Sequence, residues 1–297
     1  MTHDTLRKGI VYMVFASFCF ALMGAAARAL GERLGAVELV LFRNLIGVIF
    51  LFFSVWKRPI KQVGGRNGLL IFRGIIGTLA LFTFFYSITA IGLAEAITYQ
   101  QTYPIFLALM SYYFLQEYLK KKEWIAIFVG FGGICFIFLP QMSGGLAQIN
   151  NHFLGVLNAI MTAMAYLSIR KLSTRYDARV IILSFMLSGI LLPIFSLLVG
   201  YIAKPTGAWQ IVFPTFVFPI HREWLWIALL GFAALLGQIY LTKAFTHGKA
   251  GLISVAGYSN IVFSVFFGWL LGDAFPAWTS LVGIFLVILG GFLISQK

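Results

Sequence analysis

The stretch LAEAITYQQTYP, residues 93–104, concentrates oxygen-bearing side chains at the head of a long apolar run. On a helix, side chains three and four positions apart share a face. The polar residues that fall within an arc of about 100°, or just beside it, are Glu95, Thr98, Tyr99, Thr102 and Tyr103. Carboxylate, hydroxyl and phenol groups gathered in this way can bind a small polar solute. Because a charged group facing lipid would cost a few kcal/mol, we expect this face to look onto a water-filled cavity or onto protein.

Pro104 removes a backbone N–H donor and loosens a helix one turn upstream, near Gln100. Carbonyl groups freed at membrane depth must be satisfied by side-chain amides or by a bound ligand. Gln100 and Gln101 lie outside the polar arc, and interhelical hydrogen bonding is the alternative for both. For Glu95, which lies near the outer end of its apolar run, simple solvation is the alternative.

Further polar residues within apolar runs are candidates for the same pocket. Counted from the outer end of its run, Arg43 lies at about the same membrane depth as Tyr99. Its guanidinium could bind a carboxylate through two parallel hydrogen bonds. Snorkelling of Arg43 to the outer interface is the alternative. Arg73 and Glu117 both lie near the inner surface, so we expect them to form an ion pair. The remaining candidates for a substrate site are Tyr86, Asn158, Tyr166, Gln238, Tyr258 and Asn260.

The elements that position these residues follow from the hydropathy of the chain. Of its 297 residues, 61% are hydrophobic and 10% are charged, and the mean hydropathy of +0.94 excludes an ordinary soluble domain. Ten runs approach or exceed the length of about 20 residues that crosses a bilayer as a helix: 9–30, 36–56, 68–91, 94–115, 122–139, 152–169, 178–201, 222–246, 248–271 and 276–295. The first run could alternatively be a cleaved signal peptide. It is longer than the usual apolar core of such a peptide, so we interpret it as a transmembrane helix. The predicted fold is an all-α polytopic membrane protein with ten transmembrane helices.

The 22 Lys and Arg residues are distributed by side of the membrane and do not require a nucleic-acid partner. If the N-terminus lies inside, sixteen of them fall in inner segments and four in outer segments, while Arg43 and Arg73 lie within spans. Segments rich in Lys and Arg stay in the cytoplasm. We therefore expect a multi-pass protein of the bacterial inner (plasma) membrane, surrounded by lipid, with both termini cytoplasmic.

Weak internal similarity divides the chain into two halves. A shift of 156 residues aligns the fourth run with the ninth, matching Gly92 to Gly248, and a shift of 142 residues aligns the first run with the sixth. Such repeats are typical of secondary transporters. Since each half holds five spans, the second half must enter the membrane from the opposite side. We predict two inverted five-helix repeats, residues 1–140 and 141–297.

Several motifs resemble the drug/metabolite transporter superfamily in its ten-helix branch. They are LFRN (41–44), RGIIGTLALFTFFYSI (73–88), GLAEA (92–96), Pro104, LQEYLKKKEW (115–124) and GFGG (130–133). The resemblance covers essentially the whole chain, and the first half is similar to S-adenosylmethionine-uptake-like and amino-acid-exporter-like permeases. It implies two inverted repeats around a central cavity, with the fifth and tenth helices at the periphery. The second half departs from the family pattern at Asn260, in the usual proline position, and at Asp273, in the position of the usual acid.

We expect the chain to carry a small polar or zwitterionic metabolite, such as an amino acid, S-adenosylmethionine or a related compound, by alternating access. It has no GxxxxGK[ST] motif for direct use of ATP. Its two cysteines and four histidines show no metal-binding spacing, and no cofactor is expected. One alternative is an intramembrane enzyme acting on lipid, for which Glu38 and Glu95 at the outer rim are the only candidate pair of carboxylates. The other is a non-transporting subunit that binds a partner through the proline-rich loop 202–221. We predict no enzyme, and the oligomeric state is left open.

Overall fold

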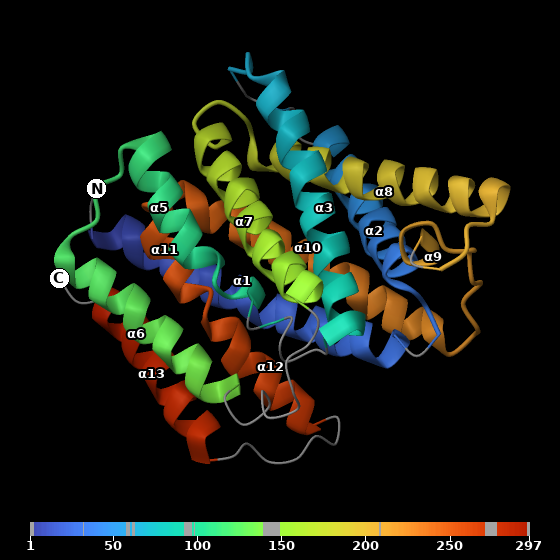
Figure 1. Ribbon diagram of the computed structural model, residues 1–297. Helices are drawn as coiled ribbons and strands as arrows, with labels where there is room; N and C mark the ends of the chain where they lie inside the picture. The colour runs from blue at the N-terminus through green and yellow to red at the C-terminus, as the bar shows by residue number, and fades with distance from the viewer. Residues whose placement is uncertain are drawn as a thin grey trace.

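The computed structural model of the chain is a bundle of helices, and no strand occurs among the residues that it describes (Figure 1). Those residues are 3–31, 33–57, 60, 63–91, 97, 99–138, 149–207, 209–270 and 278–295. The helices are α1 (His3–Leu30), α2 (Ala36–Lys57), α3 (Asn67–Ile91), α5 (Tyr103–Leu115), α6 (Lys121–Phe138), α7 (Ile149–Leu172), α8 (Ala178–Ala203), α9 (Trp209–Val212), α10 (Glu223–Thr246), α11 (Ala250–Ala256), α12 (Ser259–Leu270) and α13 (Trp278–Ser295). Each predicted span contains helix in its described part, so the predicted all-helical class is confirmed.

The helices have the length and composition of membrane spans. In the described part of the chain, seven are long and apolar enough to cross a membrane: Thr5–Leu30, Ala36–Lys57, Asn67–Ser87, Phe153–Leu172, Ala178–Ala203, Glu223–Thr246 and Ala250–Leu270. Tyr103–Leu115 and Leu281–Gly290 are shorter apolar helices. Large apolar side chains cover the outside, including Trp56 at 77% and Leu225 at 80% exposure. Such a surface suits lipid as the solvent, as expected of a polytopic membrane protein.

Both chain ends lie at the same end of the bundle, which we call the terminal end (Figure 1). Because α1 runs away from this end and successive spans alternate in direction, the connections that follow α2, α5, α7 and α10 also lie there. The connections that follow α1 and α8 lie at the opposite end. Contacts at the two ends can therefore be told apart by the loops that make them.

Helices from the first part of the chain pack against helices of the second part in matching pairs. α1 packs against α10 and α12, and α7 packs correspondingly against α3 and α5. α2 contacts α8 and α10, while α8 contacts α2 and α3. α6 and α13 lie side by side at the edge of the bundle (Figure 1). Exchanging α1, α2, α3, α5 and α6 with α7, α8, α10, α12 and α13 therefore reproduces the main helix contacts.

The spans predicted at 94–115 and 248–271 are both interrupted. A turn at residues 101–102 precedes α5, whose first turn contains Pro104, and a turn at residues 257–258 separates α11 from α12. The interruption predicted from Pro104 is therefore present. The two turns lie 156 residues apart, which is the offset that aligns the two segments in the sequence.

The loop between α7 and α8 ends in an N-cap residue, Asp177. Its carboxylate accepts hydrogen bonds from the Arg179 guanidinium, at 2.7 Å, and from the Arg179 backbone N–H, at 2.9 Å. These bonds, the guanidinium bond first, hold the pKa of the Asp177 carboxyl below its usual value.

Replacing Asp177 by alanine is expected to lower the free energy of unfolding by about 1 kcal/mol, measured by thermal unfolding in detergent. Because folding lowers this pKa, the stabilisation is complete above about pH 4, the pKa in the unfolded chain, and is lost as the pH falls through the folded pKa. Asp177→Asn keeps a capping oxygen, so its free energy of unfolding should fall less at pH 7 than that of the alanine variant. This variant should not show the acid-dependent loss, because asparagine does not titrate. Equal losses in the two variants would contradict the capping role.

Candidate functional site

Two arginine side chains lie fully inside the bundle. Arg43 of α2 is 1% exposed and Arg73 of α3 is 2% exposed. Both guanidinium groups lie over the ring of Phe185 in α8, with distances from Cζ to the ring centroid of 5.6 Å for Arg43 and 4.4 Å for Arg73. Since both distances end at one centroid, the two guanidinium carbons are at most about 10 Å apart. The Tyr166 hydroxyl of α7 is within electrostatic range of both. We call this group, together with Gln238 of α10, the arginine centre.

The two guanidinium groups have few hydrogen-bond partners among the described residues. Arg73 Nη2 donates to Gln238 Oε1 at 3.4 Å, whereas Nε and Nη1 of Arg73 and all three nitrogens of Arg43 have no partner. The carboxylates whose contacts the structure describes bind elsewhere: Glu38 to Val217, Glu117 to Arg170, Glu123 to Lys120, Asp177 to Arg179 and Glu223 to Arg33. A buried cation without a partner is costly. The arginine centre is therefore suited to bind anionic groups of a ligand.

Glycines make room for the arginine centre. A Cβ atom at Gly77, one turn after Arg73, would collide with Arg73 Nη1 and approach the Phe185 ring within about 3 Å. Glycine at this position lets the guanidinium lie along α3. Gly74 faces α8 in the same way, since a Cβ atom there would collide with the Ser188 hydroxyl and with the backbone of Ser184. These two glycines bring α3 and α8 close enough for Arg73 to reach Phe185.

The segment of α2 that carries Arg43 is held against α8 by small residues. Asn44 donates to the carbonyl oxygen of Gly189 in α8 at 3.2 Å. A Cβ atom at Gly189 would collide with the Asn44 side chain, and one at Gly47 would collide with Met186. The α2–α8 contact is therefore close at Asn44 and Gly47, just after Arg43, and it holds this part of α2 against α8.

The two interrupted spans meet beside the arginine centre. The Tyr103 hydroxyl, at the start of α5, donates to the carbonyl oxygen of Ser254 in α11 at 3.3 Å. The Ser17 hydroxyl of α1 donates to the carbonyl oxygen of Gly257 at 3.4 Å. These side chains supply donors near a break where helix carbonyls lose their usual partners. The Tyr103 ring also packs edge-on against the Tyr166 ring, with a centroid distance of 5.0 Å, and so connects the interruption to the arginine centre.

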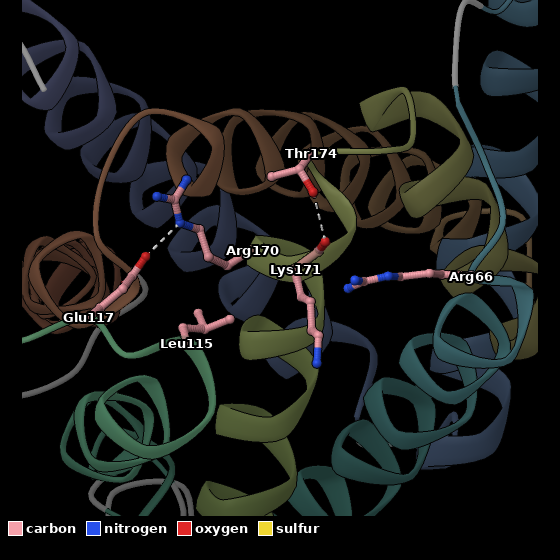
Figure 2. Close-up of a pocket in the computed structure, with 6 residues that line it drawn as sticks. All are labelled: Arg66, Leu115, Glu117, Arg170, Lys171 and Thr174. Atoms are coloured by element: carbon pink, nitrogen blue, oxygen red, sulfur yellow. Dashed lines mark hydrogen bonds and ion pairs between the residues drawn. The ribbon is translucent and has the colours of Figure 1, made fainter.

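An ion pair lies at the terminal end of the bundle (Figure 2). Arg170 Nε, at the end of α7, donates to Glu117 Oε1, just after α5, at 3.0 Å. Glu117 Oε2 also accepts from the backbone N–H of Ala250 at 2.8 Å, and Arg170 Nη1 donates to the carbonyl oxygen of Phe245 at 3.2 Å. We call this group the terminal latch, because it joins the ends of α5, α7, α10 and α11.

A cavity of about 200 Å³ lies beside the terminal latch. Its lining residues are Arg66, Leu115, Glu117, Arg170, Lys171 and Thr174. Figure 2 shows the Arg66 guanidinium pointing toward the Lys171 side chain. With three cations and one carboxylate in its lining, the cavity carries net positive charge.

A second ion pair lies at the opposite end. Arg33, between α1 and α2, donates through Nε to Glu223 Oε1 at the start of α10, at 2.9 Å, and through Nη2 to the carbonyl oxygen of Phe218 at 3.0 Å. Nearby, the buried Glu38 of α2 accepts a hydrogen bond from the backbone N–H of Val217 at 3.3 Å. We call this group the opposite latch. Like the terminal latch, it joins a segment of the first 140 residues to one of the last 157.

The family follows from a comparison with known proteins. The model of the EamA-like transporter family matches residues 7–139 and again residues 150–296. The chain belongs to this family. The predicted resemblance to the drug/metabolite transporter superfamily is therefore confirmed, and the chain is a membrane transporter and not an enzyme.

Relatives of this EamA-like transporter align along its whole length. A transporter of Helicobacter pylori (strain J99) is 30% identical over 296 residues, which cover 98% of this chain and 96% of the relative. The pseudopaline exporter CntI of Pseudomonas aeruginosa (strain UCBPP-PA14) is 29% identical over 297 residues, which cover 100% of this chain and 99% of the relative. A solved crystal structure matches with a TM-score of 0.80 at 18% identity, covering 96% of this chain and 95% of that one, which supports the fold.

The arginine centre of this EamA-like transporter contains three of the residues predicted to bind substrate. Arg43 lies within it, Gln238 accepts a hydrogen bond from Arg73, and Tyr166 lies within range of both guanidinium groups. The alternative that Arg43 snorkels to the interface is wrong, because its side chain is buried over Phe185. A role of these three residues in binding stays a prediction.

The polar residues predicted on one face before α5 are described only in part. Glu95 and Thr98 lie outside the described residues. The Tyr99 ring packs against Gly155 of α7, and the Thr102 hydroxyl donates to the carbonyl oxygen of Tyr99 at 2.7 Å. The structure therefore gives Tyr99 a packing partner and Thr102 a local hydrogen bond, and their contact with substrate stays a prediction.

Three more predicted residues lie on α3, α7 and α12. Asn158 of α7 donates to the carbonyl oxygen of Ala80 in α3 at 2.5 Å, which ties the two helices together. Asn260 accepts a hydrogen bond from the Ser264 hydroxyl at 3.0 Å. Tyr86 lies half-buried in α3. Their part in a substrate site stays a prediction.

Tyr258 lies at the interruption between α11 and α12. Its side chain is fully buried, and its ring packs against Gly130 of α6, where a Cβ atom would collide with it. α6 lies at the edge of the bundle (Figure 1). Tyr258 thus packs α12 against the outer pair of helices, and its predicted contact with substrate stays a prediction.

The expected ion pair between Arg73 and Glu117 is wrong. Glu117 pairs with Arg170 instead, and Arg73 lies over Phe185. Arg73 is six residues beyond the start of α3 at Asn67, which places it about 9 Å into the helix by the rise per residue. The expectation relied on counting residues from the end of the apolar run, which does not give the direction of a side chain.

Sequence reasoning missed Arg73 and Phe185 as parts of one site. The available signal was RGIIG, in which glycine follows Arg73 at one residue and at four residues. Glycines on the face that carries a charged residue predict a close helix contact at that charge. Phe185 itself had no signal, because the chain has 31 phenylalanines, most of them in apolar runs.

Proposed function

We propose that the chain is a secondary transporter that moves a small polar metabolite across the membrane by alternating access. One observation carries the proposal: the terminal latch and the opposite latch lie at the two ends of the bundle, with the arginine centre buried between them. Breaking one latch at a time would expose the centre to one side of the membrane only. The structure, with both ion pairs formed, corresponds to a closed state between the two open ones.

The moving parts are two halves, residues 1–140 and 141–297, which we infer to be inverted repeats. The matched helix contacts support this inference, as do the two interruptions at an offset of 156 residues. The family model also matches each half separately. Both latches join one half to the other, so rocking of the halves would break and form them alternately.

We infer that the terminal end faces the cytoplasm of a bacterial cell and that the chain lies in its inner membrane. The distribution of Lys and Arg along the sequence supports this orientation. Both chain ends would then be cytoplasmic. Membrane lipid would cover the exposed apolar side chains, and the metabolite would be the other partner.

Alternating access predicts reciprocal exposure of two buried positions. Ser254 lies in α11 beneath the terminal latch, and Ala26 lies in α1 toward the opposite latch, and both are fully buried. In a background with Cys19 and Cys135 replaced by alanine, Ser254→Cys and Ala26→Cys variants would be reconstituted in liposomes. Each would be labelled with a membrane-impermeant maleimide from its own side.

A mixed pool of small acids, amino acids and nucleosides would then be added on one side of the membrane. Maleimide labelling is expected to rise in one of the Ser254→Cys and Ala26→Cys variants and to fall in the other. Uptake of a labelled member of the pool should accompany the change. Simultaneous labelling of both positions would indicate an open channel, and failure of both to react under any gradient would contradict alternating access.

A further inference from the structure

We propose that the solute of this site is a small dicarboxylate, with one carboxylate bound to Arg43 and the other to Arg73. The inference rests on the proposed transport function, and it names the chemical class of what is carried. The sequence alone predicts a small polar or zwitterionic metabolite. The proposal restricts this substrate class to compounds that carry two anionic groups.

The charge of the arginine centre favours a ligand with two negative groups. Arginine stays protonated in proteins, so the centre holds two permanent positive charges. No carboxylate among the described side chains contacts either guanidinium, and Gln238 and Tyr166 are uncharged at neutral pH. A ligand with one negative charge would leave one buried cation uncompensated. A ligand with two carboxylates compensates both.

The free hydrogen-bond donors of the two guanidinium groups suit carboxylates. Arg43 offers all of its guanidinium nitrogens, and Arg73 offers Nε and Nη1, because only Arg73 Nη2 has a partner among the described residues. A planar guanidinium binds a carboxylate through two parallel hydrogen bonds. The two groups share the Phe185 ring and lie at most about 10 Å apart. A short aliphatic diacid can place a carboxylate at each and rest its methylene groups near that ring.

The cavity beside the terminal latch carries the same sign of charge as the arginine centre. The cavity at the terminal latch is lined by Arg66, Arg170 and Lys171, with Glu117 as its one acidic residue. A positively charged cleft raises the local concentration of anions and disfavours cations. Positive charge therefore occurs both at the terminal end of the bundle and at the arginine centre.

The test is ligand binding to the purified protein in detergent, by isothermal titration calorimetry and by thermal stability. The probes are succinate, glutarate, glutamate, glutamine, propionate and inorganic phosphate. Glutamate and glutamine have nearly the same size and differ by one carboxylate. At least one of succinate, glutarate and glutamate is expected to bind at least tenfold more tightly than glutamine and propionate.

Binding of that diacid should weaken at least 100-fold in both Arg43→Gln and Arg73→Gln. Arg43→Lys, which keeps the charge and loses the paired hydrogen bonds, should fold and bind the diacid at least tenfold more weakly. Arg222→Gln is the matched control, since Arg222 is exposed at the start of α10, and it should bind as the parent does.

Three results would overturn the proposal. One is equal affinity for glutamate and glutamine with no diacid preferred. Another is tighter binding of phosphate than of any diacid. The third is no diacid binding at all.

The binding test does not depend on transport. If reciprocal labelling occurs and diacids do not bind, the substrate class is wrong and the transport mechanism stands. If diacids bind to the arginines and neither Ser254→Cys nor Ala26→Cys changes its labelling, the site stands and alternating access is wrong.

Discussion

Replacement of Arg170 by glutamine is expected to raise, at least tenfold, the rate at which the Ser254→Cys variant reacts with an impermeant maleimide from the terminal end. Arg170 donates to Glu117 and to the carbonyl oxygen of Phe245. The Arg170 and Glu117 side chains are only 20% and 14% exposed, so solvent screens their interaction weakly. A hydrogen bond to a charged group contributes about 1.5–3 kcal/mol, and about 1.4 kcal/mol changes an equilibrium tenfold. Without Arg170, the terminal end should therefore be open more often.

The partner variant Glu117→Gln tests whether the ion pair itself holds the latch. Since Arg170 and Glu117 bind each other, the double variant should react no faster than the faster single variant. Arg175→Gln, on the exposed loop after α7, is the control and should react at the parent rate. Additive effects of the two substitutions, or an increase in the control, would show that the pair does not close this end.

The all-helical class could be predicted from the sequence, because an apolar run that crosses a bilayer must satisfy its backbone groups within itself. The interruption before α5 could also be predicted, since Pro104 removes a donor whatever surrounds it. The second interruption could not. The turn at residues 257–258 has no proline, and it follows instead from the packing of Gly257 and Tyr258 against Tyr103 and Gly130.

The composition of the site was predictable only in part. A buried arginine in an apolar run marks a functional position, and Arg43 was recognised on that ground. Its neighbours were not, because the contact between Arg43, Arg73 and Phe185 depends on how α2, α3 and α8 are rotated against one another. The rotation of a helix depends on close contacts such as that of Gly77 with Arg73. Counting residues along one apolar run gives the depth of a side chain and does not reveal these contacts.

Substitution of Gly133 by alanine is expected to destabilise the protein by about 1–3 kcal/mol, as an overpacked contact does, measured by thermal unfolding in detergent. A Cβ atom at Gly133 would lie 2.6 Å from the carbonyl oxygen of Gly283 and 2.9 Å from the backbone nitrogen of Val287, both in α13. Backbone atoms cannot turn aside as a side chain can, so α13 would have to move away from α6.

The neighbouring Gly132 is a matched control within the same helix turn. A Cβ atom at Gly132 meets nothing within 4 Å, so Gly132→Ala should be neutral or stabilise by up to about 1 kcal/mol through helix propensity. Equal shifts in the two variants would show that the close α6–α13 contact does not limit stability. Because α6 and α13 pair at the edge of the bundle (Figure 1), binding to the arginine centre should be unchanged in the folded fraction of either variant. Loss of stability with binding intact would identify the outer pair as a scaffold against which the central helices move.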